Sequence, residues 1–100
     1  MTVEEFQRSL AGAALPPGLP APLAALWWDA KGDWGKAHAL VDSLENAEGM
    51  AVHAYLHRKE GDASNAEYWY RKAGRGFYRA ELAEEWEALV EGLIHGSTQL

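Results

Sequence analysis

A chain of 100 residues with a formal net charge of −6 limits what this protein can be. Five tryptophans and a hydrophobic content of 48% are enough for the core of a single domain, residues 1–100. The absence of cysteine excludes disulfides, thiolate catalysis and thiolate metal sites. The negative charge argues against a nucleic-acid partner, because basic residues that neutralise phosphates supply most of the nonspecific affinity.

The start of the chain and its hydropathy predict where the protein works. Residues 1–6 are acidic where a secretory signal would be basic. No apolar run approaches the ~18 residues of a membrane-spanning helix. We therefore expect a cytoplasmic protein without a membrane partner, which agrees with the lack of disulfides.

Residues 1–13 are predicted to form a short helix that is followed by an extended connector. Thr2 and Glu5 have the spacing of a capping box at the helix start, and Phe6 lies on the expected buried face. All four prolines of the chain fall within residues 14–22. Proline lacks an amide donor and forces the preceding residue out of the helical region, so the helix ends before this segment.

Residues 23–73 are predicted to form two short helical hairpins. Each hairpin has a Gly-Asp corner, Gly32-Asp33 or Gly61-Asp62, and the two corners lie 29 residues apart. Glycine ends one helix in the left-handed conformation, and the aspartate caps the free amides of the next. Apolar residues recur at helical spacing on both sides of each corner, which gives every helix one face for burial. Repetition at such an interval is typical of stacked units.

The residues after each corner resemble the second half of a tetratricopeptide repeat. An alanine follows each aspartate by four residues, and a large residue stands four further on: Ala37 and Val41 in the first hairpin, Ala66 and Tyr70 in the second. Ala25 and Ala54 fall where that family keeps a small residue in its first helix. The interval of 29 residues is shorter than the family's 34. The stretch from His53 to Ala73 is also similar to small uncharacterised bacterial proteins, a likeness that implies no activity.

Residues 79–95 are predicted to form an amphipathic C-terminal helix. Its apolar residues share one face, and its five glutamates share the opposite, solvated face. The apolar positions are Leu82, Trp86, Leu89, Val90, Leu93 and Ile94. Stacked repeats leave an apolar face open at the end of the array, and a helix with one polar side can cover it. We therefore expect an all-α fold of about six helices in stacked antiparallel hairpins, capped by this helix.

No catalytic motif is recognisable in the chain. The sequence contains no Gly-x-Ser-x-Gly, no phosphate-binding glycine loop and no His-Glu-x-x-His. We therefore predict a protein that is not an enzyme and uses no cofactor. The favoured function is a protein-protein interaction module.

The family resemblance implies where such a module would bind its partner. The groove-lining positions of its second repeat correspond to Glu48, Tyr55, Arg58 and Lys59. Tyr55 together with Arg58 and Lys59 suits a protein partner or an acidic peptide. Residues 58–79 carry six basic and three acidic side chains, and a solvated surface is the plainer interpretation of this charge. A homodimer formed by exposed aromatic residues or by the last helix is a third possibility.

The alternative function is a small metal-binding protein or enzyme that uses His53 and His57. Positions i and i+4 of a helix bring two imidazoles to one face, ~6 Å apart, where they can share a metal ion or a proton. His38 and Glu60 are the candidates for a third ligand, since zinc sites usually have three or four protein ligands. Because both histidines lie on the apolar stripe with Ala54, we favour packing in the helix interface, with hydrogen bonds to neighbours.

Overall fold

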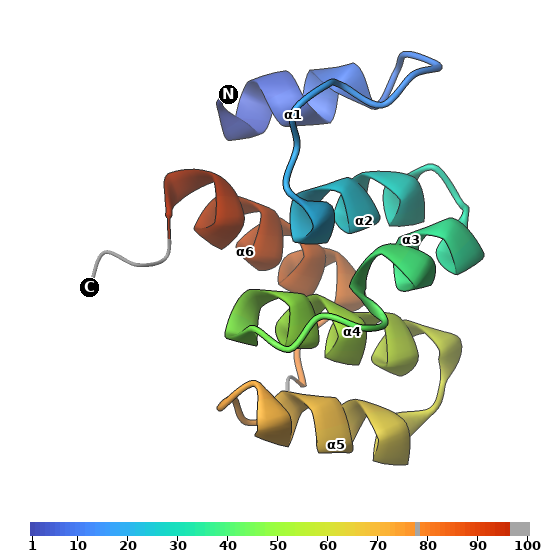
Figure 1. Ribbon diagram of the computed structural model, residues 1–100, viewed down its shortest axis with the longest axis vertical. Coiled ribbons are helices and arrows are strands. Elements are labelled where there is room, and N and C mark those ends of the chain that lie inside the picture. The colour runs from blue at the N-terminus through green and yellow to red at the C-terminus, as the bar shows by residue number, and fades with distance from the viewer. Residues whose placement is uncertain (78, 97–100) are drawn as a thin grey trace.

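Local capping signals set the start of several helices in the computed structural model, which describes residues 1–77 and 79–96. Within these residues the chain forms six helices and no strand. They are α1 (Val3–Ser9), α2 (Ala21–Ala30), α3 (Trp34–Val41), α4 (Ala47–Glu60), α5 (Ala63–Lys72) and α6 (Leu82–His95) (Figure 1). The expected all-α fold of about six helices is confirmed.

The two Gly-Asp corners adopt the predicted conformation. Gly32 and Gly61 have φ angles of +89° and +93°, in the left-handed region that favours glycine. The carboxylates of Asp33 and Asp62 each accept a hydrogen bond from the backbone amide three residues on, at 3.0 and 3.2 Å. The capping box at the start of α1 is also formed. These turns are therefore encoded by residues next to them in the sequence.

Two antiparallel hairpins stack side by side in the structure. Helix α2 packs against α3, and α4 packs against α5, while α2 and α3 both contact α4 (Figure 1). Ala54 of α4 and Ala66 of α5 are completely buried with Tyr70, so the second hairpin closes tightly at these small residues. The larger core gathers side chains from α1, α2, α3, α4 and α6, among them Phe6, Trp27, Val41, Leu56 and Val90.

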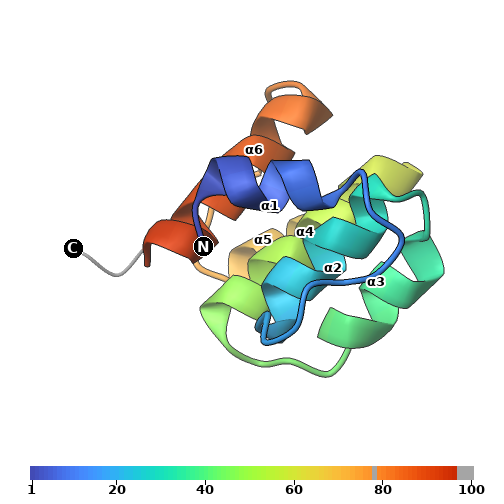
Figure 2. The ribbon, with the colours of Figure 1, turned by 90° about the horizontal axis from the view of Figure 1, so that it is seen from above.

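The C-terminal helix α6 does not lie where the sequence predicted, at the end of the stack. It crosses α2 and α4 and also contacts α1 (Figure 1, Figure 2). Trp86, Leu89 and Val90 join the larger core, and the Trp86 indole donates a hydrogen bond of 3.0 Å to the Leu26 carbonyl. The outer side of α5 carries exposed polar residues such as Glu67, with Tyr68 as its exposed aromatic residue, so α6 finds a more apolar surface on α2 and α4.

The longest helices of the described residues, α4 and α6, have 14 residues each. A helix that spans a bilayer needs about 20 predominantly apolar residues. None of the described helices combines the length and the apolar character that such a span requires.

The Leu44 side chain packs closely on Gly49 in the first turn of α4. A Cβ atom added at Gly49 would lie 2.6 Å from the Cβ of Leu44, in the loop before the helix. Gly35 of α3 offers a contrast, because it is exposed and an added Cβ would approach nothing closer than the Asp33 side chain, at 3.9 Å. The two glycines therefore separate the effect of packing from that of helix propensity.

Gly49→Ala is expected to lower the free energy of unfolding by about 1–3 kcal/mol, because the added methyl forces Leu44 or the backbone to move. Gly35→Ala adds the same methyl at an open helical position and should raise that free energy by up to about 1 kcal/mol. Urea denaturation of both variants and the parent protein measures the difference. A midpoint for Gly49→Ala equal to that of Gly35→Ala would show that Leu44 moves aside at no cost.

Candidate metal centre

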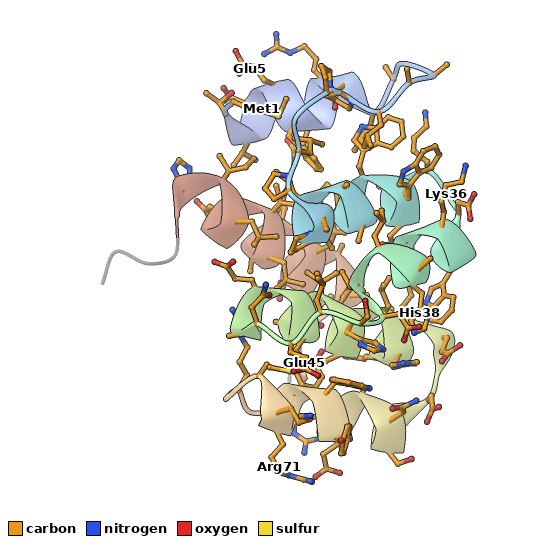
Figure 3. The ribbon with its side chains drawn as sticks, in the orientation of Figure 1. Met1, Glu5, Lys36, His38, Glu45 and Arg71 are labelled. Atoms are coloured by element: carbon orange, nitrogen blue, oxygen red, sulfur yellow. The ribbon has the colours of Figure 1, made fainter. Side chains whose placement is uncertain are left out.

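Three histidine rings converge where α3 and α4 meet. His38 comes from α3, where Figure 3 labels it, and His53 and His57 come from successive turns of α4. The ring centroids of the three pairs are 4.8, 5.1 and 4.8 Å apart, and the Nε2 atoms of His38 and His53 are 3.1 Å apart. One ring nitrogen of each histidine lies within 4.8 Å of the other two. The structure thus joins the two predicted histidines to one of the two candidate third ligands.

Short local connections bring these residues together. Only residues 42–46 separate α3 from α4, so the two helices lie side by side. The Asn46 side chain starts α4 by accepting a hydrogen bond of 2.7 Å from the Gly49 amide. Trp34, one turn before His38, donates a hydrogen bond of 2.8 Å from its indole to the Leu56 carbonyl. This bond fastens the face of α3 that carries His38 against α4.

Two tryptophans fix the planes of the imidazole rings. Trp34 stacks on His38 with a centroid distance of 4.8 Å and an angle of 9° between the planes. Trp69 of α5 stacks on His53 at 4.1 Å and 21°. Stacked rings shield each other from water and restrict rotation of the imidazoles. The orientation of His38 and His53 is therefore set by the fold itself.

Glu60 contacts Nδ1 of His57, and the other ring nitrogen, Nε2, is the one that could bind a metal ion together with His38 and His53. Its Oε2 atom is 2.7 Å from Nδ1 of His57. An ionised carboxylate can only accept a hydrogen bond, so Nδ1 carries the proton and the lone pair of His57 lies on Nε2. The sequence had offered Glu60 as a third ligand; the structure gives it the role of orienting His57 instead.

Burial and neighbouring imidazoles keep His53 neutral. Only 2% of His53 is exposed. Burial, followed by the charges of His57 and His38, lowers the pKa of His53 to about 4, while Asp42 acts in the opposite direction. Within the described residues, Nδ1 of His53 is buried without a hydrogen-bond partner. The prediction that the α4 histidines are buried in a helix interface is confirmed, but the pattern of hydrogen bonds is incomplete.

The residues predicted to line a partner groove make contacts within the chain. Tyr55 is buried and donates a hydrogen bond of 2.8 Å to Asp29 Oδ2, while Lys59 Nζ lies 2.8 Å from Asp29 Oδ1. Arg58 forms an ion pair of 2.8 Å with Glu85 of α6. Glu48 of α4 is half-buried and lines a small cavity together with Leu89 of α6. Binding of a partner by these residues stays a prediction.

Glu85 is not solvated, contrary to its expected place on the polar face of α6. It is 2% exposed, and its two oxygens accept hydrogen bonds of 2.8 and 2.6 Å from the Tyr70 hydroxyl. Burial raises the pKa of Glu85, against the opposing effect of its hydrogen bonds to Tyr70 and Arg58. Glu85 stands three residues after Leu82 and four before Leu89, so helical spacing alone places it on the apolar face.

Asp29 is a second buried carboxylate that the sequence analysis did not single out. It lies on α2, 3% exposed, and its two oxygens take the bonds from Tyr55 and Lys59. Asp29 stands four residues after Ala25, so helical spacing places both on the same face of α2. Ala25 is completely buried, and that face is therefore the core face. Both missed carboxylates thus follow from helical periodicity, whereas their partners on α4 and α5 do not.

Comparison of the chain with models of protein families, with curated proteins and with solved structures finds no match. The histidine cluster and the two buried carboxylates therefore carry the functional argument.

The buried ion pair predicts a strong coupling between Arg58 and Glu85. Arg58→Met should lower the free energy of unfolding by about 3–5 kcal/mol, because Glu85 is left as a buried charge without its cation. Glu85→Gln in the same chain removes that charge and keeps an acceptor for Tyr70, so it should restore part of the loss. Urea denaturation measures both variants. A double variant no more stable than Arg58→Met would contradict the coupling.

The lowered pKa of His53 predicts loss of stability in acid. The unfolded chain takes up the proton near pH 6.5 and the folded chain only near pH 4, so stability is retained above pH 6.5 and falls between these values. His53→Gln has no such titration. The stability advantage of the parent protein over this variant should therefore shrink by roughly 3 kcal/mol between pH 7 and pH 4.

Metal-free protein and urea denaturation at several pH values provide the measurement. His95→Gln, which removes an exposed imidazole at the end of α6, is the matched control. Parallel curves of stability against pH for the parent protein and His53→Gln would show that His53 does not carry the effect.

Proposed function

We propose that this protein binds a divalent transition-metal ion through His38, His53 and His57. The convergence of one nitrogen from each ring, all within 4.8 Å of one another, carries the proposal. Imidazole nitrogen suits zinc, copper and nickel, whereas magnesium and calcium prefer oxygen ligands. Three histidines are an established ligand set for zinc.

The spacing of the nitrogens fits a tetrahedral ion after a small movement. Two nitrogens bound to one zinc ion at 2.0–2.1 Å lie about 3.3 Å apart. The 3.1 Å between the Nε2 atoms of His38 and His53 is close to this value. The ring nitrogens of the cluster are at most 4.8 Å apart, so a pair at that distance would have to approach by about 1.5 Å or less to bind one zinc ion. His38 is the least buried of the three, so its ring can move by this distance in the plane of its stack on Trp34 without changing its orientation.

The groups around the rings favour a bound cation. Glu60, on the Nδ1 side of His57, repeats the carboxylate–histidine arrangement that orients metal ligands and raises their basicity. Asp42 Oδ1 lies 3.8 Å from Nε2 of His38, at the end of α3. Asp42 is exposed and its carboxylate lies near one of the three rings, so we assign it the fourth ligand position, which it reaches by a movement toward the cluster. Four protein ligands are typical of structural metal sites, so the proposed role is non-catalytic.

The metal ion would then fasten α3 to α4. Two of its ligands, His38 and Asp42, belong to the end of α3, and the other two belong to α4. The interaction module remains the second candidate for function, but its residues Tyr55, Arg58 and Lys59 already satisfy buried carboxylates. Within the histidine cluster, Nε2 of His38 and Nε2 of His53 share one hydrogen bond of 3.1 Å, which a bound ion would replace, and Nδ1 of His53 stays without a hydrogen-bond partner in the described residues.

Metal binding is expected to stabilise the folded protein. At a free concentration 100 times its Kd, one bound ion raises the free energy of unfolding by about 2.7 kcal/mol. Titration calorimetry with zinc or nickel should give one site per chain. His38→Gln and His57→Gln should abolish it, and Asp42→Asn should weaken it. Glu60→Gln should weaken it by about 10-fold to 100-fold, because His57 loses its orienting carboxylate.

His95→Gln is again the matched control, since it removes an imidazole outside the cluster and should leave the isotherm unchanged. Circular dichroism of each variant verifies that the fold is kept. Stoichiometric binding that survives His38→Gln, or no binding by the parent protein, would overturn the proposal. Binding that is unchanged in Asp42→Asn would keep the three-histidine site but leave its fourth position to water.

A further inference from the structure

A separate cavity lies on the other side of α4 from the histidine cluster. Tyr55 and Lys59 line it, and each stands two residues from a histidine, at His53 or His57. Two residues correspond to about 200° of helical rotation, so the two sites face in opposite directions. The end of α2 and the first half of α6 form the other walls, and Leu10 closes one side. The cavity has a volume of about 500 Å³.

The walls of this cavity are largely apolar. Leu10, Leu82 and Trp86 contribute side chains that the fold leaves only partly buried. Small-molecule sites in proteins usually measure about 300–1,000 Å³ and combine apolar walls with a few convergent polar groups. Both the size and the lining of the cavity therefore suit a compact organic ligand.

The charges of the cavity select the sign of that ligand. Asp29 holds the ammonium group of Lys59 at 2.8 Å, so these two charges compensate each other. Glu84 and Glu87 also line the cavity, and within residues 1–77 and 79–96 neither forms an ion pair. The net charge of the lining is therefore negative. An anion would meet two uncompensated carboxylates, whereas a cation would be attracted to them.

Trp86 adds a second attraction for a cation. Trp86 lines the cavity on the α6 side, on the same helix as Glu84 and Glu87, and it is only partly buried. Ammonium groups bind to the face of an indole with an energy that desolvation increases. The apolar body of a ligand can contact Leu10 and Leu82 while its cationic group remains near Glu84 and Glu87.

We propose that this cavity is a binding site for an amphipathic monocation, a primary amine carried on a compact aromatic or branched apolar body. The site is independent of the histidine cluster, so metal removal leaves it intact. Lys59 neutralises the buried Asp29, so its ammonium group is not available to an anionic ligand.

The probe is 2-phenylethylamine, and 3-phenylpropionate is the comparison compound with the same ring and the opposite charge. Calorimetry of the full chain at low ionic strength should show binding of the amine. The carboxylate should bind at least about tenfold more weakly, which is the combined effect expected of a cation–π contact and exposed ion pairs. Equal affinity for both compounds, or no binding of the amine, would overturn the proposal.

Two variants locate the binding. Glu84→Gln with Glu87→Gln should weaken the amine by about fivefold to tenfold, while Glu81→Gln with Glu91→Gln, which changes the net charge equally outside the cavity, should not. Ala83→Trp fills the cavity from an exposed position on α6 and should abolish binding while the melting curve stays cooperative. Unchanged affinity in both the Glu84/Glu87 pair and Ala83→Trp would place the amine elsewhere and refute the assignment.

Discussion

Burial of α4 on nearly every side is the constraint on which the rest of the structure depends. Residues 49–57 are all buried, although this stretch contains two histidines and a tyrosine. A buried polar group costs free energy unless it forms a hydrogen bond. The helices around α4 therefore have to supply hydrogen-bond partners for its polar side chains. Asp29 of α2 serves Tyr55, and α3 brings His38 to the two histidines. The polar residues of α4 thus determine which faces of α2 and α3 pack against it.

The same constraint explains the position of α6. An amphipathic helix can dock on any apolar surface of sufficient width, but α6 also carries a carboxylate on its buried face. Glu85 is satisfied only where both the Arg58 guanidinium and the Tyr70 hydroxyl reach it. Arg58 also donates a hydrogen bond to the Ala80 carbonyl, just before α6 begins. The polar partners come from α4 and α5, and the apolar face of α6 packs on α2 and α4, so packing and polar matching select the same docking site.

How well the sequence predicts a feature depends on how far apart in the chain the residues that determine it lie. The side-chain caps that start α1, α3 and α5 and the Gly-Asp corners depend on groups three residues apart, and these predictions were confirmed. Helices without such a cap start elsewhere than predicted: α2 begins at Ala21, inside the predicted connector, and α6 begins at Leu82. The His53–His57 pair is also local, and it predicted two of the three residues of the cluster. The choice between His38 and Glu60 as the third member depended on how α3 packs on α4, which one sequence does not reveal. Partners for Glu85 depended on three helices at once, so the sequence placed that residue in solvent.

Helix α4 carries two chemically different faces that do not share residues. The histidine face is rich in nitrogen and walled by tryptophans, while the face with Tyr55 and Lys59 opens to an apolar cavity with acidic residues. Each face is completed by a different neighbour, α3 for the first and α6 for the second. A change at one site can therefore be studied without removing the ligands of the other.

The histidine cluster also differs from the α6 contacts in the length of chain that must be ordered to form it. His38 and His53 are 15 residues apart, whereas Trp86 and the Leu26 carbonyl that it contacts are 60 residues apart. Closing a loop four times as long costs about 1.2 kcal/mol more chain entropy. The histidine cluster thus forms from contacts with a small loop-closure entropy, which favour early formation during folding. Docking of α6 joins residues that are far apart in the chain and is expected to come later.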